Sequence, residues 1–408
     1  MAFERLATLD LELPNIGVNV ISGMAIDWAN GKLFCANYDT SDDKSHVMLI
    51  DVETFTKSVD NARVGYEALS IDNIGTLQFD RFSGYLYAYL KTSSSHVWVQ
   101  LDPDTLNIDA WTGATSYAIA GHGAAVAVID EAMDEEYLSS LFFSITSPRW
   151  DGTELRVNKA ITTIYNMLTG EWDPSFSIVD TNIIDTVDTA NGTFGYNNLI
   201  CVGNFLYVIY RQATPVVVYL LKISKVDLSI VDQLVIPAYS TQSHAMAYSS
   251  YDEKLYVGYN STSNKDARVA QIDIGSFTIT EIISTPFNSA EGYVYPMGID
   301  NYNGYLYVGL QSAGLKDRFK KISLDDFSLV GTVEVDSTAE NITSPTAAMQ
   351  YDPIDGVIYA PISVTGTGAG SGPMIIKLRA DVGITPNVAR NSLHRPNKPY
   401  NFNISNSR

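Results

Sequence analysis

The fold is decided by a hairpin-like stretch, whose clearest copy is Met297-Gly298-Ile299-Asp300-Asn301-Tyr302-Asn303-Gly304-Tyr305-Leu306-Tyr307-Val308-Gly309-Leu310. Apolar residues alternate with polar or small ones on each side of Asn303-Gly304, and this dipeptide favours the positive φ angles of a tight turn. The stretch therefore predicts two antiparallel strands joined by a turn.

The same hairpin recurs along the chain. Its second strand starts with an aliphatic anchor at Leu33, Leu86, Leu206, Leu255, Leu306 and Ile358. The anchors are 49 to 53 residues apart, except for 120 residues between Leu86 and Leu206. Such a period is typical of one four-stranded propeller blade. The longer gap accommodates two units, so we place a missing anchor strand at residues 137–143 and predict seven blades.

A second pattern follows each anchor by about 15 to 20 residues. It is a strand that runs into a polar turn, with copies at 50–55, 101–106, 165–170, 272–277 and 322–327. Short Asp, Asn, Ser and Thr side chains suit such turns because they hydrogen-bond to turn amides. We interpret the pattern as the outer hairpin of each blade.

The two ends of the chain predict how the ring closes. Residues 4–12 alternate apolar and polar, while the seventh unit ends after Leu378 without a fourth strand of its own. An N-terminal strand that completes the last blade would remove exposed sheet edges. The predicted fold is thus all-β: a single seven-bladed β-propeller over residues 1–382, followed by an extended basic C-terminal arm, 383–408.

Two segments interrupt the repeat and are predicted as long loops. The first is an insertion in the third blade at residues 144–158, and the second is the connection 180–194. Long loops in a compact fold are usually functional or flexible. The sequence does not decide between these roles.

Charge is unevenly distributed. The chain has a formal charge of −20 and a pI near 4.5, which argues against nucleic acid and anionic membranes as partners. From Arg379 onward the segment carries +4, which leaves −24 on the remainder. The N-terminus does not resemble a secretion signal, and no apolar run is long enough for a membrane helix. We expect a virion protein if the source is viral and a cytoplasmic protein otherwise.

A family resemblance rests on two copies of the repeat. Residues 32–37 (Lys-Leu-Phe-Cys-Ala-Asn) with 47–54, and residues 254–259 with 269–273, resemble the Tyr-Val-Thr-Asn (YVTN) type of β-propeller repeat. The resemblance implies the architecture and carries no reaction with it.

Candidate binding residues are placed by the predicted topology. Loops between the second and third strands share a face with the connections between blades, and that face is the default binding surface. Its candidate residues are His46, His96, His122, Arg149, Trp150, Arg211, His244, Asp266, Arg268, Lys316 and Arg318. The arm contributes the assembly candidates Arg390, His394, Arg395, Lys398 and Tyr400.

We predict no catalytic residues, metal or cofactor. Catalytic propellers usually work from the central channel, yet the first-strand positions here are Ala25, Gln78, Ala247, Gly298 and Gln350. These are small or neutral, so no carboxylate ring for calcium is expected. His122 and His244 are candidates to approach the axis, but a transition metal needs a third ligand. The corresponding positions hold Ser22, Gly75, Tyr295 and Ala347.

Three functions remain open. The first is a non-enzymatic binding propeller within a larger assembly, such as a tail, fibre or decoration component of a phage particle. Its partners would be protein subunits, a second copy bound through the arm, or a host-surface glycan or protein. The second is an enzyme of the lactonase or quinoprotein kind. The third is a cytoplasmic scaffold for protein interactions. Bound metal would favour the enzyme, and assembly through the arm would favour the first reading.

Overall fold

A computed structural model describes most of the chain. The described residues are 2–11, 21–39, 44–61, 71–80, 84–92, 96–111, 125–130, 140–149, 152–166, 171–184, 193–213, 216–238, 245–261, 266–284, 287, 291–312, 315–342, 349–364 and 372–381. All elements in these ranges are β-strands. No helix among them has the length and apolar content that crossing a membrane requires.

Six sheets each contain four consecutive antiparallel strands, paired in chain order. The first two are β2 (Ile21–Asp27), β3 (Lys32–Asp39), β4 (Lys44–Asp51), β5 (Thr56–Asn61) and then β6 (Ile71–Phe79), β7 (Leu86–Thr92), β8 (His96–Leu101), β9 (Ile108–Trp111). The next two are β10 (Ala125–Asp130), β11 (Ser140–Arg149), β12 (Gly152–Asn166), β13 (Glu171–Ile184) and β14 (Thr193–Val202), β15 (Phe205–Ala213), β16 (Val216–Ser224), β17 (Ile230–Ile236). The last two are β18 (Ala245–Ser249), β19 (Lys254–Asn260), β20 (Ala267–Asp273), β21 (Thr278–Ile283) and β22 (Glu291–Asp300), β23 (Tyr305–Ser312), β24 (Arg318–Ser323), β25 (Leu329–Glu334).

The remaining sheet, which we call the closing sheet, combines both ends of the described chain. It contains β1 (Arg5–Asp10), β26 (Glu340–Asn341), β27 (Gln350–Asp352), β28 (Val357–Val364) and β29 (Gly372–Arg379). Strand β1 pairs antiparallel with β29, so that Arg5 lies opposite Leu378 and Asp10 opposite Met374. The predicted closure by the N-terminal segment is therefore confirmed.

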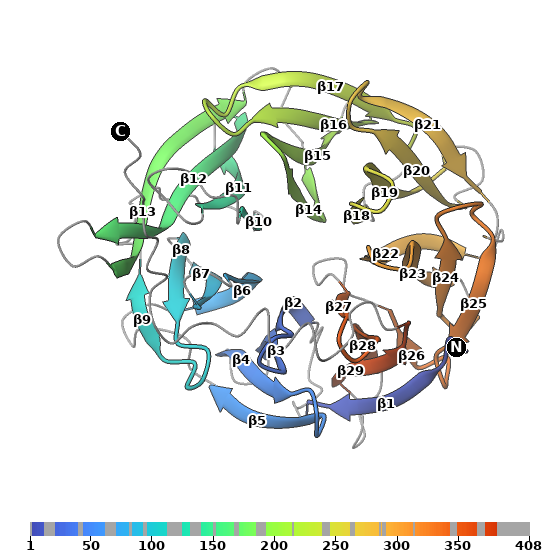
Figure 1. Ribbon diagram of the computed structural model, residues 1–408. Helices are drawn as coiled ribbons and strands as arrows, with labels where there is room; N and C mark the ends of the chain where they lie inside the picture. Colours follow the sequence, from blue (N-terminus) through green and yellow to red (C-terminus); the bar gives the residue numbers. More distant parts are fainter. Residues whose placement is uncertain are drawn as a thin grey trace, which may run out of the picture.

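The sheets are arranged radially around a central axis, with first strands innermost and fourth strands on the rim (Figure 1). The chain is thus a β-propeller. The predicted count of seven blades needs correction, because six sheets among the described residues have the four-stranded form. The closing sheet has a fifth, two-residue strand, β26, and borrows β1 from the N-terminus.

The predicted loop insertion at 144–158 is wrong. Residues 140–149 and 152–166 form strands β11 and β12, which pair from Ser140↔Ile161 to Arg149↔Gly152. The connection predicted at 180–194 is also partly strand, since β13 continues to Ile184 and β14 begins at Thr193. The extra residues lengthen a hairpin, because alternating Thr, Ile, Val and Tyr favour strands at this length.

The core lies between neighbouring sheets. All six aliphatic anchors named above are fully buried. One cluster joins Leu33 and Met48 of the first sheet to Tyr359 and Ile375 of the closing sheet. Another joins Phe319 of β24 to residues of β28 and β29. Interdigitation of sheet faces therefore holds the ring together through its apolar contacts.

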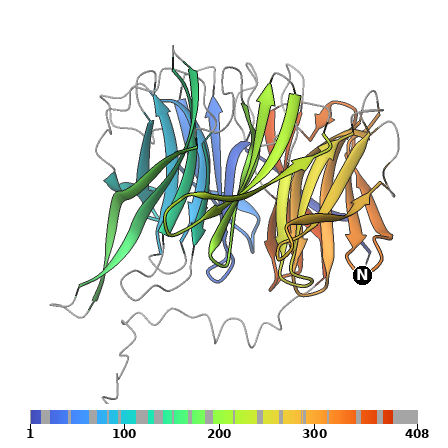
Figure 2. The same ribbon diagram turned by 90° about the horizontal axis from the view of Figure 1, so that it is seen from above.

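The antiparallel order gives the disc two faces, seen edge-on in Figure 2. We call the face with the loops between second and third strands the loop face. We call the face with the turns between first and second, and between third and fourth, strands the turn face.

Candidate functional site

Several predicted binding residues fall where the structure gives no side-chain account. His122, Trp150 and His244 lie outside the described residues, as does the arm with Arg390, His394, Arg395, Lys398 and Tyr400. For His96, Arg149 and Arg211 the structure describes backbone pairing alone, in β8, β11 and β15. His46 lies in β4 opposite Asn37 and is only 7% exposed, so its position favours a role inside the sheet.

Two predicted loop-face charges pair with each other. The Arg268 guanidinium lies 3.5 Å from the Asp266 carboxylate, and it also donates to the carbonyl of Ser284 at 3.3 Å. Lys316 donates to the carbonyl of Asp336 at 2.7 Å. These contacts fasten loop to strand within the disc.

Arg318 belongs to a larger loop-face cluster. Its guanidinium lies 2.8 Å from Glu334 and 3.4 Å from Glu291, and Glu291 also receives Lys320 Nζ at 2.6 Å. Glu291 and Lys320 are buried. Two carboxylates on one guanidinium raise the pKa of Arg318 despite its partial burial, which acts in the opposite direction. Because the Glu291 carboxylate is buried and already paired with Lys320 and Arg318, it holds strands in place and is not positioned to bind a ligand.

Asp317, between Lys316 and Arg318, was not predicted as a site residue. Its buried carboxylate accepts backbone N–H groups of Ser312 at 2.8 Å and of Ile342 at 2.7 Å. Burial raises its pKa, and the two amide bonds partly oppose that. Asp317 therefore shapes the loop and ties sheet β22–β25 to the segment that leads into the closing sheet.

The central axis is lined by closely packed first strands. A side-chain Cβ at Gly298 would lie 3.1 Å from the Cβ of Met349, and one at Gly23 would lie 2.7 Å from the backbone nitrogen of Leu77. Gln350 donates to the carbonyl of Met24 at 3.1 Å. The small and neutral residues on these strands are thus explained by packing between neighbours. Among the described residues, no group of three or more His, Cys, Asp or Glu is placed to hold a metal ion.

On the turn face, lysine side chains form contacts between neighbouring sheets that were not predicted from the sequence. A lysine on the third strand lies opposite an aromatic residue on the second, as in Tyr207↔Lys222, Tyr307↔Lys321 and Tyr359↔Lys377. Each ammonium reaches the next sheet: Lys222 donates to the carbonyl of Ile274 at 3.2 Å and Lys377 to that of Val52 at 3.2 Å. Lys321 instead binds the Asp381 carboxylate at 2.6 Å.

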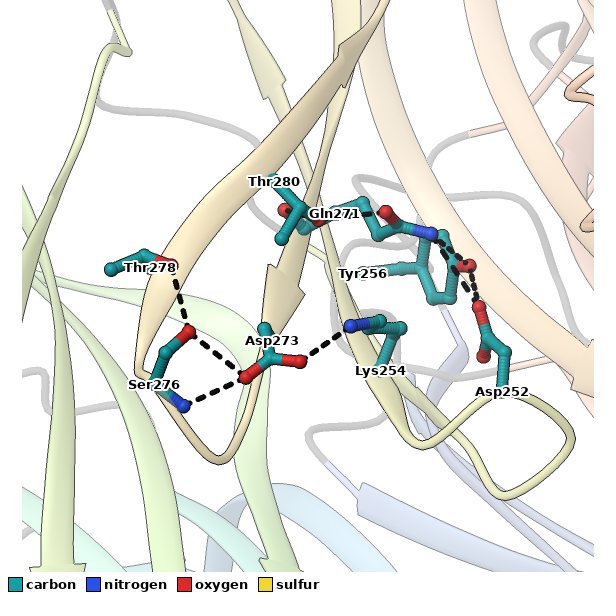
Figure 3. Close-up of polar contacts among 8 residues, drawn as sticks. All are labelled: Asp252, Lys254, Tyr256, Gln271, Asp273, Ser276, Thr278 and Thr280. Atoms are coloured by element: carbon teal, nitrogen blue, oxygen red, sulfur yellow. Dashed lines mark hydrogen bonds and ion pairs between the residues drawn. The ribbon is translucent and has the colours of Figure 1, made fainter.

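Aromatic rings surround these ammonium groups. Lys321 Nζ lies 3.8 Å from the ring centroid of Tyr305, and Lys222 Nζ lies 4.4 Å from that of Phe205. Each cation–π contact of this kind contributes roughly 0.5–2 kcal/mol. In sheet β18–β21 glutamine replaces the lysine: Gln271 donates to the Tyr256 hydroxyl at 3.0 Å, and that hydroxyl donates to Asp252 at 2.5 Å (Figure 3).

The turns between third and fourth strands repeat one local structure. An aspartate caps the turn, as Asp273 does by accepting from the Ser276 amide at 2.7 Å while binding Lys254 at 2.5 Å (Figure 3). A bulky apolar residue then adopts positive φ, with values of 51° to 59° at Phe55, Leu106, Leu228, Phe277 and Phe327. Such conformations are costly for branched or bulky residues, so packing must hold them. Phe277 meets Tyr207 of the preceding sheet at 6.0 Å between ring centroids.

The chain leaves the disc from the turn face. Asp381 follows β29, where the other sheets turn from third to fourth strand, but here the fourth strand is β1 from the other end of the chain. Besides Lys321, the Tyr351 hydroxyl holds this exit by donating to the Asp381 carbonyl at 2.8 Å. Asn303 Nδ2 reaches the same carbonyl at 3.5 Å. The position at which the arm begins is therefore fixed.

Beside this exit lies an exposed surface that we call the turn-face patch. It consists of Tyr251, Glu253, Tyr302, Asp325 and Asp326. Tyr302, next to Asn303, is 52% exposed, and Tyr251 is 45% exposed. The Tyr251 ring covers Gly304 and its hydroxyl donates to Asp325 at 3.0 Å. That bond to Asp325 raises the Tyr251 pKa, which marks the patch as acidic.

Comparison with solved structures supports the fold. No family model matches the chain, and no curated protein matches it. Among solved structures it is similar to the Dos1 propeller, with a TM-score of 0.54 at 11% identity over 88% of this chain and 78% of that chain. The dihydro-heme d1 dehydrogenase NirN in complex with DHE gives a TM-score of 0.44 at 8% identity, over 76% of this chain and 56% of that chain. The fold and the first likeness define a β-propeller.

Proposed function

We propose that this chain is a non-enzymatic binding propeller that serves as one subunit of a larger assembly, joined to it through the C-terminal arm. A phage particle is the assembly we favour, with the chain as a tail, fibre or decoration component of the virion that contacts a host-surface glycan or protein. We also propose that the closing sheet counts as a seventh blade.

The observation that carries this proposal is that the arm is positively charged while the disc from which it leaves is negatively charged. Residues 383–408 contain Arg390, Arg395, Lys398 and Arg408 and no acidic residue, so the arm carries +4 and the disc −24. The disc residues Arg379 and Asp381 are engaged with Glu4 and Lys321. Opposite charges on two parts of one chain favour association between copies or with another acidic protein.

Rigidity of the disc supports a binding role. Charged side chains on both faces are used to fasten strands and sheets, as in Glu291–Lys320 on the loop face and Lys321–Asp381 on the turn face. A preorganised surface loses little conformational entropy on binding, which improves affinity for a partner of fixed shape.

The test is sedimentation of the full chain and of the full-length variant Arg390→Gln/Arg395→Gln/Lys398→Gln, each at low and at high salt. We expect an oligomer for the parent chain at low salt, and dissociation both in the variant and at high salt, because ionic screening weakens exposed charge pairs. A parent chain that is monomeric under all these conditions and binds no partner would contradict the proposal.

A further inference from the structure

The turn-face patch combines features of a docking surface. Single exposed apolar residues are common on protein surfaces. Tyr251 and Tyr302, however, lie on adjoining turns, because the Tyr251 ring contacts Gly304 in the turn that carries Tyr302. Tyrosine is enriched at protein interfaces because a large ring and a polar hydroxyl are presented at small entropic cost. Asp325 accepts the Tyr251 hydroxyl, and the exposed acidic residues Glu253 and Asp326 belong to the same turns as Tyr251 and Asp325.

The negative potential at this patch extends to the exit of the arm. After burial, the largest influences that raise the Tyr305 pKa are the carboxylates Asp381, Asp300 and Asp325. Lys321, whose Nζ lies 3.8 Å from the centroid of the Tyr305 ring, is buried and bound to Asp381. A cationic partner segment is therefore favoured here over an anionic one.

The occupant is indicated by where the chain leaves the disc and by its sequence. The arm starts at a carbonyl that contacts Asn303, the neighbour of Tyr302. Its 26 residues carry only positive charge and include the apolar residues Val388, Leu393, Tyr400 and Phe402. Fully extended, a segment of this length spans roughly 90 Å, which is enough to reach across to another disc.

We propose that the turn-face patch is the docking surface for the arm, residues 383–408, of a second copy of this chain. Because each copy has its arm exit next to its patch, two discs related by a two-fold axis place each arm over the other disc, which gives a closed and reciprocal dimer. The inference rests on the proposed function, since it names the surface that receives the assembly arm.

The test uses full-length chains and measures the dimer dissociation constant by sedimentation over a concentration series. The patch variant neutralises the three carboxylates and removes the free ring: Glu253→Gln, Asp325→Asn, Asp326→Asn and Tyr302→Ser. These changes keep a hydrogen-bond acceptor at each acidic position, including the one that receives Tyr251.

A control makes comparable changes outside the patch, on exposed residues of the rim and of the β4–β5 turn: Glu53→Gln, Asp232→Asn, Glu281→Gln and Val235→Ser. We expect the patch variant to raise the dimer dissociation constant at least tenfold, and the control to leave it within twofold. Melting temperatures of both variants serve to confirm that the disc is folded.

Three results would overturn the inference, and they differ in whether the proposed function is also contradicted. If the patch variant dimerises like the parent while the arm variant Arg390→Gln/Arg395→Gln/Lys398→Gln is monomeric, the arm docks elsewhere and the proposed function stands. If the parent is monomeric and its arm is protected from trypsin only while the patch is intact, the arm occupies its own disc. If the parent is monomeric with an unprotected arm and binds no partner, both proposals fail.

Discussion

Lys321 Nζ lies 2.6 Å from Asp381 Oδ2, although the two residues belong to neighbouring sheets. Lys321 is buried in β24, while Asp381 follows the last strand of the chain's described part. The contact therefore joins sheet β22–β25 to the closing sheet at the point where the arm begins. This ion pair, which we call the clasp, and the start of the proposed assembly arm therefore lie at one position.

The clasp predicts that Lys321→Met lowers the free energy of unfolding more than Lys254→Met does. Lys321→Met removes a buried ammonium from the Asp381 carboxylate, which is 23% exposed, and from the Tyr305 ring, so the loss should be about 2 kcal/mol. Lys254→Met breaks the more exposed pair with Asp273, which contributes at most about 1 kcal/mol. Urea unfolding measures both, and equal losses in the two variants would show that Lys321 is not a clasp.

The positive φ at Phe277 predicts an unusual order of stabilities. Phe277→Ala removes a buried ring at a cost of roughly 3–5 kcal/mol. Phe277→Gly removes the same ring but relieves the left-handed backbone, so it should be more stable than the alanine variant by about 1 kcal/mol. The control is Phe319, a buried strand residue, where glycine should be the less stable of the two. Thermal melts that show the same order at both positions would contradict this account.

The turn aspartates predict a loss of stability in acid. Hydrogen bonds from Thr54 lower the pKa of Asp51, and those from Ser328 lower that of Asp326; for Asp273 the Lys254 ammonium is the main cause. A group whose pKa is lowered on folding stabilises the fold above its unfolded pKa, near 4, and loses this contribution as pH falls through its folded pKa.

Buried Asp317 and Asp352 act in the opposite direction, because burial raises the pKa of each. Their protonation in the folded state adds stability as pH falls below the folded pKa. We therefore expect the triple variant Asp51→Asn/Asp273→Asn/Asp326→Asn to show a smaller drop in melting temperature between pH 6 and pH 3 than the parent chain. An identical drop in both would mean that these caps do not govern the acid response.

The Tyr256 hydroxyl predicts a local polar network in sheet β18–β21. It donates to Asp252 and accepts from Gln271, so Tyr256→Phe should cost about 1–2 kcal/mol. The matched change Tyr302→Phe, on an exposed ring, should cost less than about 0.5 kcal/mol. Denaturant unfolding distinguishes the two, and a neutral Tyr256→Phe would exclude a stabilising role for the network in Figure 3.

Much of the ring follows from local sequence. The Leu306-type anchor after each Asn-Gly-like turn, and the Asp-capped turn after it, both repeat at blade spacing, and the structure places these anchors in the core. Closure by residues 4–12 was predictable because the last unit lacks a fourth strand. The number of four-stranded blades and the long hairpin of the third blade were harder to predict from the sequence. A long strand and a long loop differ little in composition when Thr and Asn alternate with apolar residues.

The site was harder to predict. Arg268 has one partner nearby, Asp266, but the other partners of Arg268 and Arg318 are remote: Ser284, Glu291 and Glu334 lie 16 to 27 residues away in sequence. The third-strand lysines carried a signal that was overlooked: an aromatic residue directly follows each anchor, and Lys or Gln lies opposite it in every sheet except the first, where Leu49 lies opposite Phe34. The turn-face patch depends on Tyr251 covering Gly304, across two sheets, which no local pattern encodes.

The central claim is that the disc assembles through its C-terminal arm. The most direct measurement is the mass of the native particle in solution, by light scattering, for the full chain and for a chain that ends at Val382. All described strands lie before that residue, so the shorter chain keeps every blade. We predict an oligomer for the full chain and a monomer for the shorter one. Equal masses for the two chains would contradict the claim.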